Sequence, residues 1–122
     1  MKNILIVDDN EEVRTLYQLA LEGPDFLVKT SSSRNEALAL LQTNWKPDLI
    51  ILDFRMPGLS LNEFLDFLKS QESLSNCKVI TMSSFSKRDQ IIERSEISIP
   101  FFQKPSSIED LVSIVKDSLS LV

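Results

Sequence analysis

The chain has 122 residues, 43% of them hydrophobic and 25% charged, which is an ordinary composition for a single globular domain. Thirteen basic and eighteen acidic residues give a net charge of -5, which argues against direct binding to nucleic acid or to an anionic membrane because the field of the protein repels phosphate. With no histidine and one cysteine, Cys77, the chain has no histidine-based catalytic triad, histidine-ligated metal or internal disulfide, and we expect a reducing, cytoplasmic location.

Short aliphatic segments alternate with longer segments of helical periodicity along the whole chain. The predicted strands are residues 4–7, 26–30, 49–52, 79–82 and 100–103. The first and third of these are apolar on both faces, which is typical of central parallel strands covered by helices, and they are far too short to span a bilayer. Because Pro100 has no N–H to donate, we expect the last strand to begin there, at an edge of the sheet.

Apolar residues three and four positions apart predict the helices between these strands. Asp9 and Glu12 are a candidate capping pair for the first helix, and capping boxes predict that the second begins at Ser33 and the fifth at Ser106. The fourth helix, over residues 86–94, has the weakest pattern. The predicted buried faces are Val13, Leu16, Tyr17, Ala20 and Leu21 in the first helix, Ala37, Leu38, Leu40 and Leu41 in the second, Leu61, Phe64, Leu65 and Leu68 in the third, and Ile108, Leu111, Val112, Val115 and Leu119 in the fifth.

Five strand–helix units predict an α/β fold over residues 1–122, taken as a single domain. Right-handed crossovers favour a doubly wound parallel sheet of the (βα)5 type. In such a sheet the ligand site lies at the carboxyl ends of the strands. The residues that follow or close those ends are Asp8, Asp9, Asp53, Ser83 and Lys104.

The side chains at this edge suit phosphoryl chemistry with a metal ion. Three carboxylates close together repel one another, and a hard divalent cation relieves that repulsion. Oxygen ligands without histidine or cysteine favour Mg²⁺ over zinc. One carboxylate can then attack phosphorus to form an aspartyl phosphate, while Ser83 and Lys104 supply a hydroxyl and a cation for the phosphoryl oxygens.

Each of these residues also has a simpler explanation. Paired aspartates after a strand commonly form turns or cap helices, a serine there is usual in loops, and a lysine before proline is usually solvated. Any one of the residues alone is better explained in that way. Five of them at four strand ends are hard to attribute to chance, so the phosphoryl-transfer interpretation is favoured.

Three motifs carry a resemblance to a known family. Residues 4–9 (Ile-Leu-Ile-Val-Asp-Asp), residues 53–58 (Asp-Phe-Arg-Met-Pro-Gly) and the pair Lys104-Pro105 resemble the motifs of the response-regulator receiver domain of two-component signalling, as in chemotaxis regulators. The resemblance covers the whole chain and implies a flavodoxin-like fold with strand order 2-1-3-4-5. It also implies a phosphorelay signalling module rather than an enzyme, one that catalyses only its own phosphorylation and dephosphorylation.

The resemblance implies a phospho-acceptor and a metal site. Asp53 is the expected acceptor of the phosphoryl group. The expected Mg²⁺ ligands are Asp9, Asp53 and the backbone carbonyl of Arg55, with Asp8 helping through a water molecule. The cofactor that the resemblance implies is therefore Mg²⁺.

The resemblance also implies a switch. Ser83 is the expected switch hydroxyl, Lys104 is expected to contact the phosphoryl group, and Phe101 stands at the position of the switch aromatic. Because Phe101 has no hydroxyl, any switching there depends on ring packing alone. The bond between Lys104 and Pro105 is expected to be cis, since that kink turns the ammonium toward Asp53.

The implied partners are proteins. The phosphoryl donor is a histidine kinase or a histidine phosphotransfer protein, and the signal passes to a downstream protein target or output domain, with room for a homodimer on phosphorylation. We expect partner binding on the face of the fourth helix, fifth strand and fifth helix, where Ile97, Ile99, Pro100 and Phe101 are apolar. The equal alternative is that these residues pack inward. Whether the chain stands alone or belongs to a longer protein is open at this point, as are its kinase and its target.

Three other functions compete with this interpretation. A Mg²⁺-dependent phosphatase with an aspartate nucleophile commonly needs a second aspartate two residues later, where this chain has Arg55. A flavin-binding domain of similar topology binds phosphate directly after the first strand, where this chain has an acidic loop. A degenerate receiver that serves only as an interaction module would have no need of the intact acidic cluster. Mg²⁺-dependent uptake of phosphate from a small phosphodonor is required of a receiver and is not expected of the flavin-binding domain or the degenerate receiver.

Two residues are expected to set the lifetime of the phosphorylated state. Hydrolysis needs a water in line with the bond between phosphorus and the Asp53 oxygen. Arg55, two residues after Asp53, and Phe85, two residues after Ser83, flank that approach. A long cation and a phenyl ring position water poorly, so we expect slow dephosphorylation.

Overall fold

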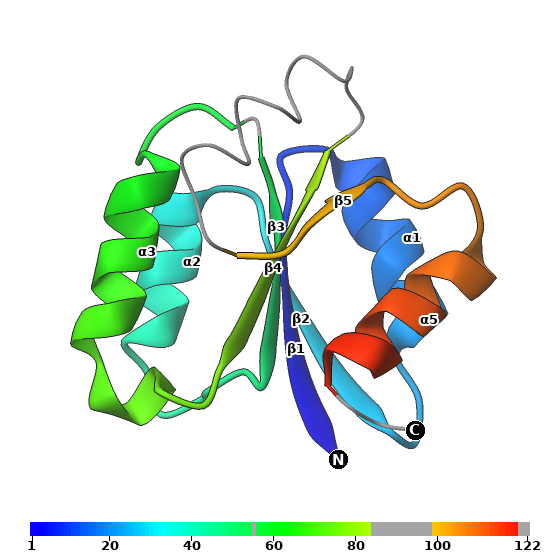
Figure 1. Cartoon of the computed structure of the whole chain (residues 1–122), viewed down its shortest axis with the longest axis horizontal. Helices are drawn as coiled ribbons and strands as arrows, with labels where there is room; N and C mark the ends of the chain where they lie inside the picture. Colours follow the sequence, from blue (N-terminus) through cyan, green and yellow to red (C-terminus); the bar gives the residue numbers. More distant parts are fainter. Residues whose placement is uncertain (55, 84–98, 120–122) are drawn as a thin grey trace.

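The computed structural model describes residues 1–54, 56–83 and 99–119. Its centre is a parallel sheet in the order β2-β1-β3-β4-β5. Helices α2 and α3 cover one face of the sheet, and helices α1 and α5 cover the other (Figure 1). The elements are β1 (Lys2–Val7), α1 (Glu11–Leu21), β2 (Phe26–Ser31), α2 (Arg34–Leu41), β3 (Leu49–Asp53), α3 (Leu61–Ser70), the 3-10 turn η1 (Glu72–Leu74), β4 (Lys78–Ser83), β5 (Phe101–Gln103) and α5 (Ile108–Ser118).

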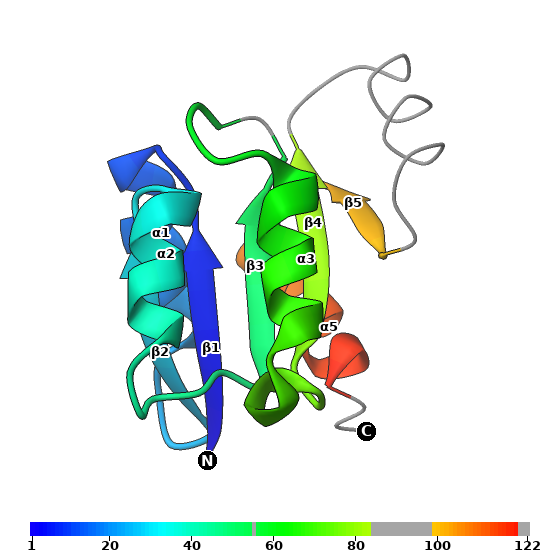
Figure 2. The ribbon, with the colours of Figure 1, turned by 90° about the vertical axis from the view of Figure 1, so that its left-hand side faces the viewer.

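This architecture confirms the predicted fold class and strand order. Turned by 90°, the sheet runs from β2 through β1 and β3 to β4 and β5, with α2 and α3 in front of it (Figure 2). The predicted fourth helix, residues 86–94, and Ile97 lie outside the described residues. Among the residues that are described, none of the helices has the length and apolar character needed to cross a membrane.

Side chains of the central strands alternate between two hydrophobic cores. Ile4 and Ile6 of β1 pack into the core beneath α1 and α5, whereas Leu5 and Val7 pack into the core beneath α2 and α3. All of β3 is buried, as the apolar run from Leu49 to Leu52 predicts for a central strand with helices on both faces. Full burial of such a side chain stabilises the fold by roughly 1.5–3 kcal/mol before entropic costs. The polar strand ends therefore sit on a rigid base.

Helix starts differ from the prediction by one residue in two places. Asn10, rather than Asp9, caps α1, because its Oδ1 accepts a hydrogen bond from the Val13 N–H at 3.1 Å. Ser107, rather than Ser106, caps α5 in the same way. The predicted start of α2 at Ser33 is confirmed. Asp9 is thus not the cap of α1, and its carboxylate belongs to the strand end instead.

Two side chains that were predicted to be buried are half exposed. Leu16 of α1 retains 51% of its surface and Ile108 of α5 retains 48%. Both line a hollow between α1 and the start of α5. Helical spacing predicts that both side chains point toward the core. The two helices are separated at this end, however, so the side chains lie at the rim of the hollow.

Candidate functional site

The three carboxylates predicted from the strand ends meet in the structure. One oxygen from each of Asp8, Asp9 and Asp53 lies within 4.8 Å of the others. Pairing of Val7 with Leu52 in the parallel register brings Asp8, which follows β1, and Asp53, which ends β3, side by side. Asp8 and Asp53 are buried, at 3% and 8% exposure, whereas Asp9 is exposed. The cluster therefore has a buried base and one side open to solvent.

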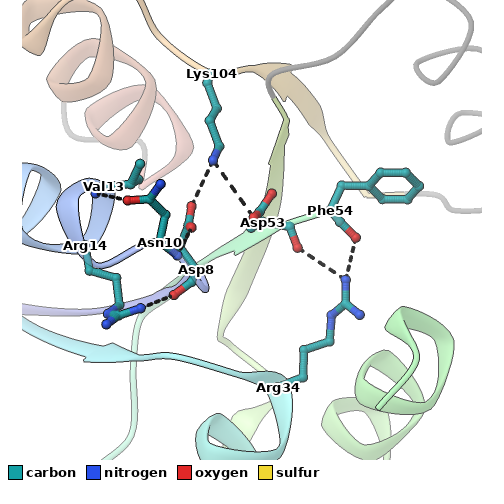
Figure 3. Close-up of polar contacts among 8 residues, drawn as sticks. All are labelled: Asp8, Asn10, Val13, Arg14, Arg34, Asp53, Phe54 and Lys104. Atoms are coloured by element: carbon teal, nitrogen blue, oxygen red, sulfur yellow. Dashed lines mark hydrogen bonds and ion pairs between the residues drawn. The ribbon is translucent and has the colours of Figure 1, made fainter. Parts of the chain in front are cut away.

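Backbone and side-chain hydrogen bonds hold Asp8 in place (Figure 3). Its Oδ1 accepts from the Asn10 N–H at 2.9 Å, and its carbonyl accepts from Nη1 of Arg14 at 2.7 Å. Its own N–H donates to the Ser31 carbonyl at 3.1 Å. These contacts fix the backbone at the end of β1, so the carboxylate does not have to be ordered when a cation or an anion arrives.

Lys104, the residue directly after β5, brings a positive charge to the carboxylates (Figure 3). Its Nζ lies 3.1 Å from Oδ2 of Asp8 and 3.9 Å from Oδ2 of Asp53. The backbone N–H of Lys104 donates to the Ser83 carbonyl at 2.6 Å, which continues the pairing of β4 with β5. The prediction of a cis bond between Lys104 and Pro105 is wrong, because there are no cis peptide bonds among the described residues. The long side chain of Lys104 reaches the site from a trans bond.

The single positive charge of Lys104 does not balance the three carboxylates, and the excess of negative charge favours the binding of a hard cation. The oxygens of Asp8, Asp9 and Asp53 are close enough together to bind one ion jointly. All three donors are carboxylates, the ligand type of Mg²⁺ and Ca²⁺ rather than of zinc or copper. The residues present therefore fit a divalent metal ion, and the open side at Asp9 leaves room for water or phosphate oxygens.

Ser83 closes β4 one residue beyond Met82, the partner of Asp53 in the sheet. It is 1% exposed, and its Oγ has no hydrogen-bond partner among the residues that the structure describes. A buried hydroxyl without a partner costs on the order of 1–3 kcal/mol. Such a group gains by binding an anion, which is the role that the sequence predicts for Ser83.

Phe101, the predicted switch aromatic, packs against the residue that follows the predicted phospho-acceptor. The rings of Phe101 and Phe54 meet edge to face, with centroids 6.3 Å apart and planes at 78°. Phe101 is half-buried, and Ile99 packs against the core beneath α2 and α3. Pro100 is exposed. The apolar segment before β5 therefore points partly inward and partly outward.

Two residues near the site were not predicted from the sequence. Arg34, the first residue of α2, is 3% exposed and donates hydrogen bonds to the carbonyls of Asp53 and Phe54. The sequence does give one sign of Arg34, its position at the start of a helix, where a cation is unfavourable.

The second residue is Tyr17. Burial, followed by the charges of Asp8 and Asp53, raises its pKa to about 12. Arg55 and Phe85 lie outside the described residues.

Comparisons with known proteins agree with this fold. A family model described as the response regulator receiver domain matches residues 4–116. Sporulation initiation phosphotransferase F of Bacillus subtilis is 31% identical over 121 residues, which cover 98% of this chain and 95% of that protein. The signal receiver domain of a signal transduction histidine kinase from Syntrophus aciditrophicus is 29% identical, with a TM-score of 0.82, covering 100% of this chain and 92% of that one. The phosphorylated cyanobacterial phytochrome response regulator RcpA is 28% identical, with a TM-score of 0.76, covering 99% of this chain and 96% of that one.

Proposed function

Since this chain belongs to the family of response regulator receiver domains, we propose that residues 1–122 form one cytoplasmic switch whose Asp53 accepts a phosphoryl group. The proposed donor is a histidine kinase or a histidine phosphotransfer protein. The observation that carries the proposal is the meeting of Asp8, Asp9 and Asp53 beside Lys104. One relative is named a phosphotransferase, and a similar structure is of a phosphorylated response regulator, which supports the same chemistry.

In the proposed reaction, an oxygen of Asp53 attacks phosphorus and forms a new P–O bond. The bond between phosphorus and the donor nitrogen breaks, and its electron pair stays on that nitrogen. Asp8, Asp9, Asp53 and the carbonyl of Arg55 would hold Mg²⁺, which supplies positive charge for the phosphoryl oxygens. Lys104 gives its ammonium to another phosphoryl oxygen, in exchange for its contact with Asp53.

Ser83 and Phe101 are the proposed links to partner binding. The Oγ of Ser83 donates to a phosphoryl oxygen, which satisfies its buried hydroxyl and draws the end of β4 toward Asp53. Because β5 pairs with β4, the ring of Phe101 then repacks against Phe54. A shift of this kind alters an existing equilibrium at the surface around β5 and α5, where a downstream partner or a second copy would bind.

Phosphate uptake tests this function directly. Incubated with Mg²⁺ and acetyl phosphate, the wild-type chain is expected to gain the mass of one phosphoryl group, measured on the intact protein. Asp53→Asn should gain none, because the amide is not a nucleophile toward phosphorus. Asp66→Asn, the same change at an exposed position of α3, is the matched control and should behave as wild type.

Phosphate uptake, together with an assay on phosphate monoesters, separates the competing functions. No phosphate uptake by the wild type would contradict the proposal and leave a degenerate receiver. Repeated release of inorganic phosphate from phosphate monoesters would indicate a phosphatase instead. Uptake that survives in Asp53→Asn would assign the acceptor role to another residue.

We also expect a long-lived phosphorylated state. Arg55 and Phe85 stand two residues beyond Asp53 and Ser83 in the sequence, and we expect their side chains to flank the path of the attacking water. The double variant Arg55→Asn with Phe85→Glu offers groups that position water, so its dephosphorylation should be about tenfold faster. Loss of the added mass after removal of the donor measures the rate, and a rate equal to or slower than wild type would contradict this steric explanation.

A further inference from the structure

Arg34 occupies a position that is unfavourable for a cation on two counts. It is the first residue of α2, where the positive end of the helix dipole repels a guanidinium. It is also 3% exposed, and arginine is rarely buried to that extent unless its donors are satisfied. A residue with these costs needs specific contacts to hold it there, and the structure shows what they are.

The guanidinium of Arg34 binds both ends of the loop that joins β3 to α3. Nη2 donates to the carbonyls of Asp53 at 3.2 Å and of Phe54 at 2.6 Å. Nη1 donates to the carbonyl of Leu59 at 3.0 Å. In Figure 3, Arg34 reaches the end of β3 from the side opposite to Lys104. Charge-assisted hydrogen bonds contribute more than neutral ones, so the three together tie the loop closely to α2.

The next residue of α2 binds the same loop. Oδ1 of Asn35 accepts a hydrogen bond from the Leu59 N–H at 3.2 Å. The residue before, Gly58, has φ of +95°, and a Cβ at that position would lie 2.8 Å from Oδ1 of Asn35. Glycine at 58 therefore serves both the left-handed backbone and the close approach of Asn35. The loop and the start of α2 fit each other as one unit.

We propose that Arg34 and Asn35 are positioning residues for phosphoryl transfer, which fix the loop that follows the phospho-acceptor. This inference rests on the proposed function, since the loop begins directly after Asp53 and includes Arg55, whose carbonyl is expected to bind metal. Neither residue touches the reacting atoms. A loop held at Asp53, Phe54 and Leu59 keeps the acceptor and the metal donors in register, so little order has to be gained during transfer.

The planar fork of arginine, rather than its charge alone, suits this role. Two nitrogens of one guanidinium reach carbonyls at both ends of the loop. A lysine ammonium is a compact point charge on a flexible stem and cannot span the same acceptors. Arg34→Lys therefore preserves the charge near Asp53 while removing the geometry, and Arg34→Met removes both.

Two measurements test the positioning role. Amide hydrogen exchange is measured without metal or phosphodonor, and the phosphorylation rate is measured with both. Amide hydrogen exchange of Leu59 should become about tenfold faster or more in Arg34→Lys and Arg34→Met, while the amides of β1 keep their wild-type protection. The phosphorylation rate at saturating Mg²⁺ should fall by about tenfold to a hundredfold in both variants. Lys46→Met is the matched control, because Lys46 also donates to a carbonyl, that of Leu41 at the far end of α2.

Asn35 provides a second route if Arg34→Met fails to fold. Asn35→Asp keeps the acceptor for the Leu59 N–H and should retain the wild-type rate, whereas Asn35→Leu should slow phosphorylation. A wild-type phosphorylation rate in Arg34→Lys and Asn35→Leu would overturn the positioning role, even if loop exchange were faster. A wild-type chain that takes up no phosphate would instead defeat the proposed function, and the exchange measurement would still show whether Arg34 and Asn35 hold the loop.

Discussion

Replacing Lys104 by methionine is expected to slow the phosphorylation of Asp53 by about a hundredfold or more at saturating Mg²⁺. The same variant should bind Mg²⁺ at least as tightly as the wild type. The two effects have opposite directions because Lys104 competes with Mg²⁺ for the carboxylates but stabilises the phosphoryl oxygens during transfer. A merely structural role for Lys104 would weaken both properties together.

The expected loss of rate follows from the placement of the ammonium. Its Nζ lies 3.9 Å from Oδ2 of Asp53, the carboxylate that we propose attacks phosphorus. Charge that develops on the phosphoryl oxygens is stabilised there without reorganisation, and the side chain of Lys104 is only 20% exposed. The expected gain in metal binding follows from the 3.1 Å contact with Asp8, since Lys104 and the cation compete for the same carboxylates.

Two measurements on one variant check this prediction. Backbone amide shifts of Asp9 during a Mg²⁺ titration give the affinity, and the mass gained from acetyl phosphate gives the rate. Lys69→Met, the same replacement at an exposed position near the end of α3, is the control. Weaker Mg²⁺ binding in Lys104→Met, or a phosphorylation rate like that of the wild type, would contradict the role assigned to the ammonium.

The arrangement of strands and the acidic cluster are the parts that the sequence predicts well. Apolar runs predict the order of strands and helices along the chain, and in a parallel sheet the residue after each strand lies at the carboxyl edge. With the strand order that the resemblance implies, Asp8, Asp53 and Lys104 come together whatever the details of the loops. Helix caps are less secure, because neighbouring polar residues such as Asp9 and Asn10 can each serve.

Contacts between loops and helices could not be predicted in the same way. The role of Arg34 depends on where the carbonyls of Asp53 and Leu59 point, and periodicity carries no information on that. The exposure of Leu16 depends on how far apart α1 and α5 lie at one end. The bond before Pro105 was inferred from resemblance alone, and the structure has it trans. These features all depend on distances between elements rather than on the elements themselves.

The titration of Tyr17 reports on the negative charge of the acidic cluster. Tyr17 is 7% exposed, and its pKa is raised from 10.0 to about 12 by burial and by the charges of Asp8 and Asp53. Tyr17 is the single tyrosine of the chain, so the ultraviolet absorbance of tyrosinate reports this group alone. In Asp53→Asn one of the nearby negative charges is gone, and the midpoint of the titration should move to lower pH. An unchanged midpoint would show that Asp53 has no influence on Tyr17.

The raised pKa of Tyr17 also makes stability depend on alkaline pH. Below its ordinary pKa the hydroxyl is protonated in the folded and the unfolded chain, so it adds no pH dependence. Between pH 10.0 and about 12 the unfolded chain releases the proton and the folded chain keeps it, so the free energy of unfolding falls by about 1.4 kcal/mol per pH unit. Tyr17→Phe lacks this proton, while every other alkaline group titrates alike in both proteins. Urea unfolding at about pH 9 and about pH 11 should therefore show the wild type losing about 1.4 kcal/mol more than the variant, and equal losses would assign the alkaline sensitivity to other groups.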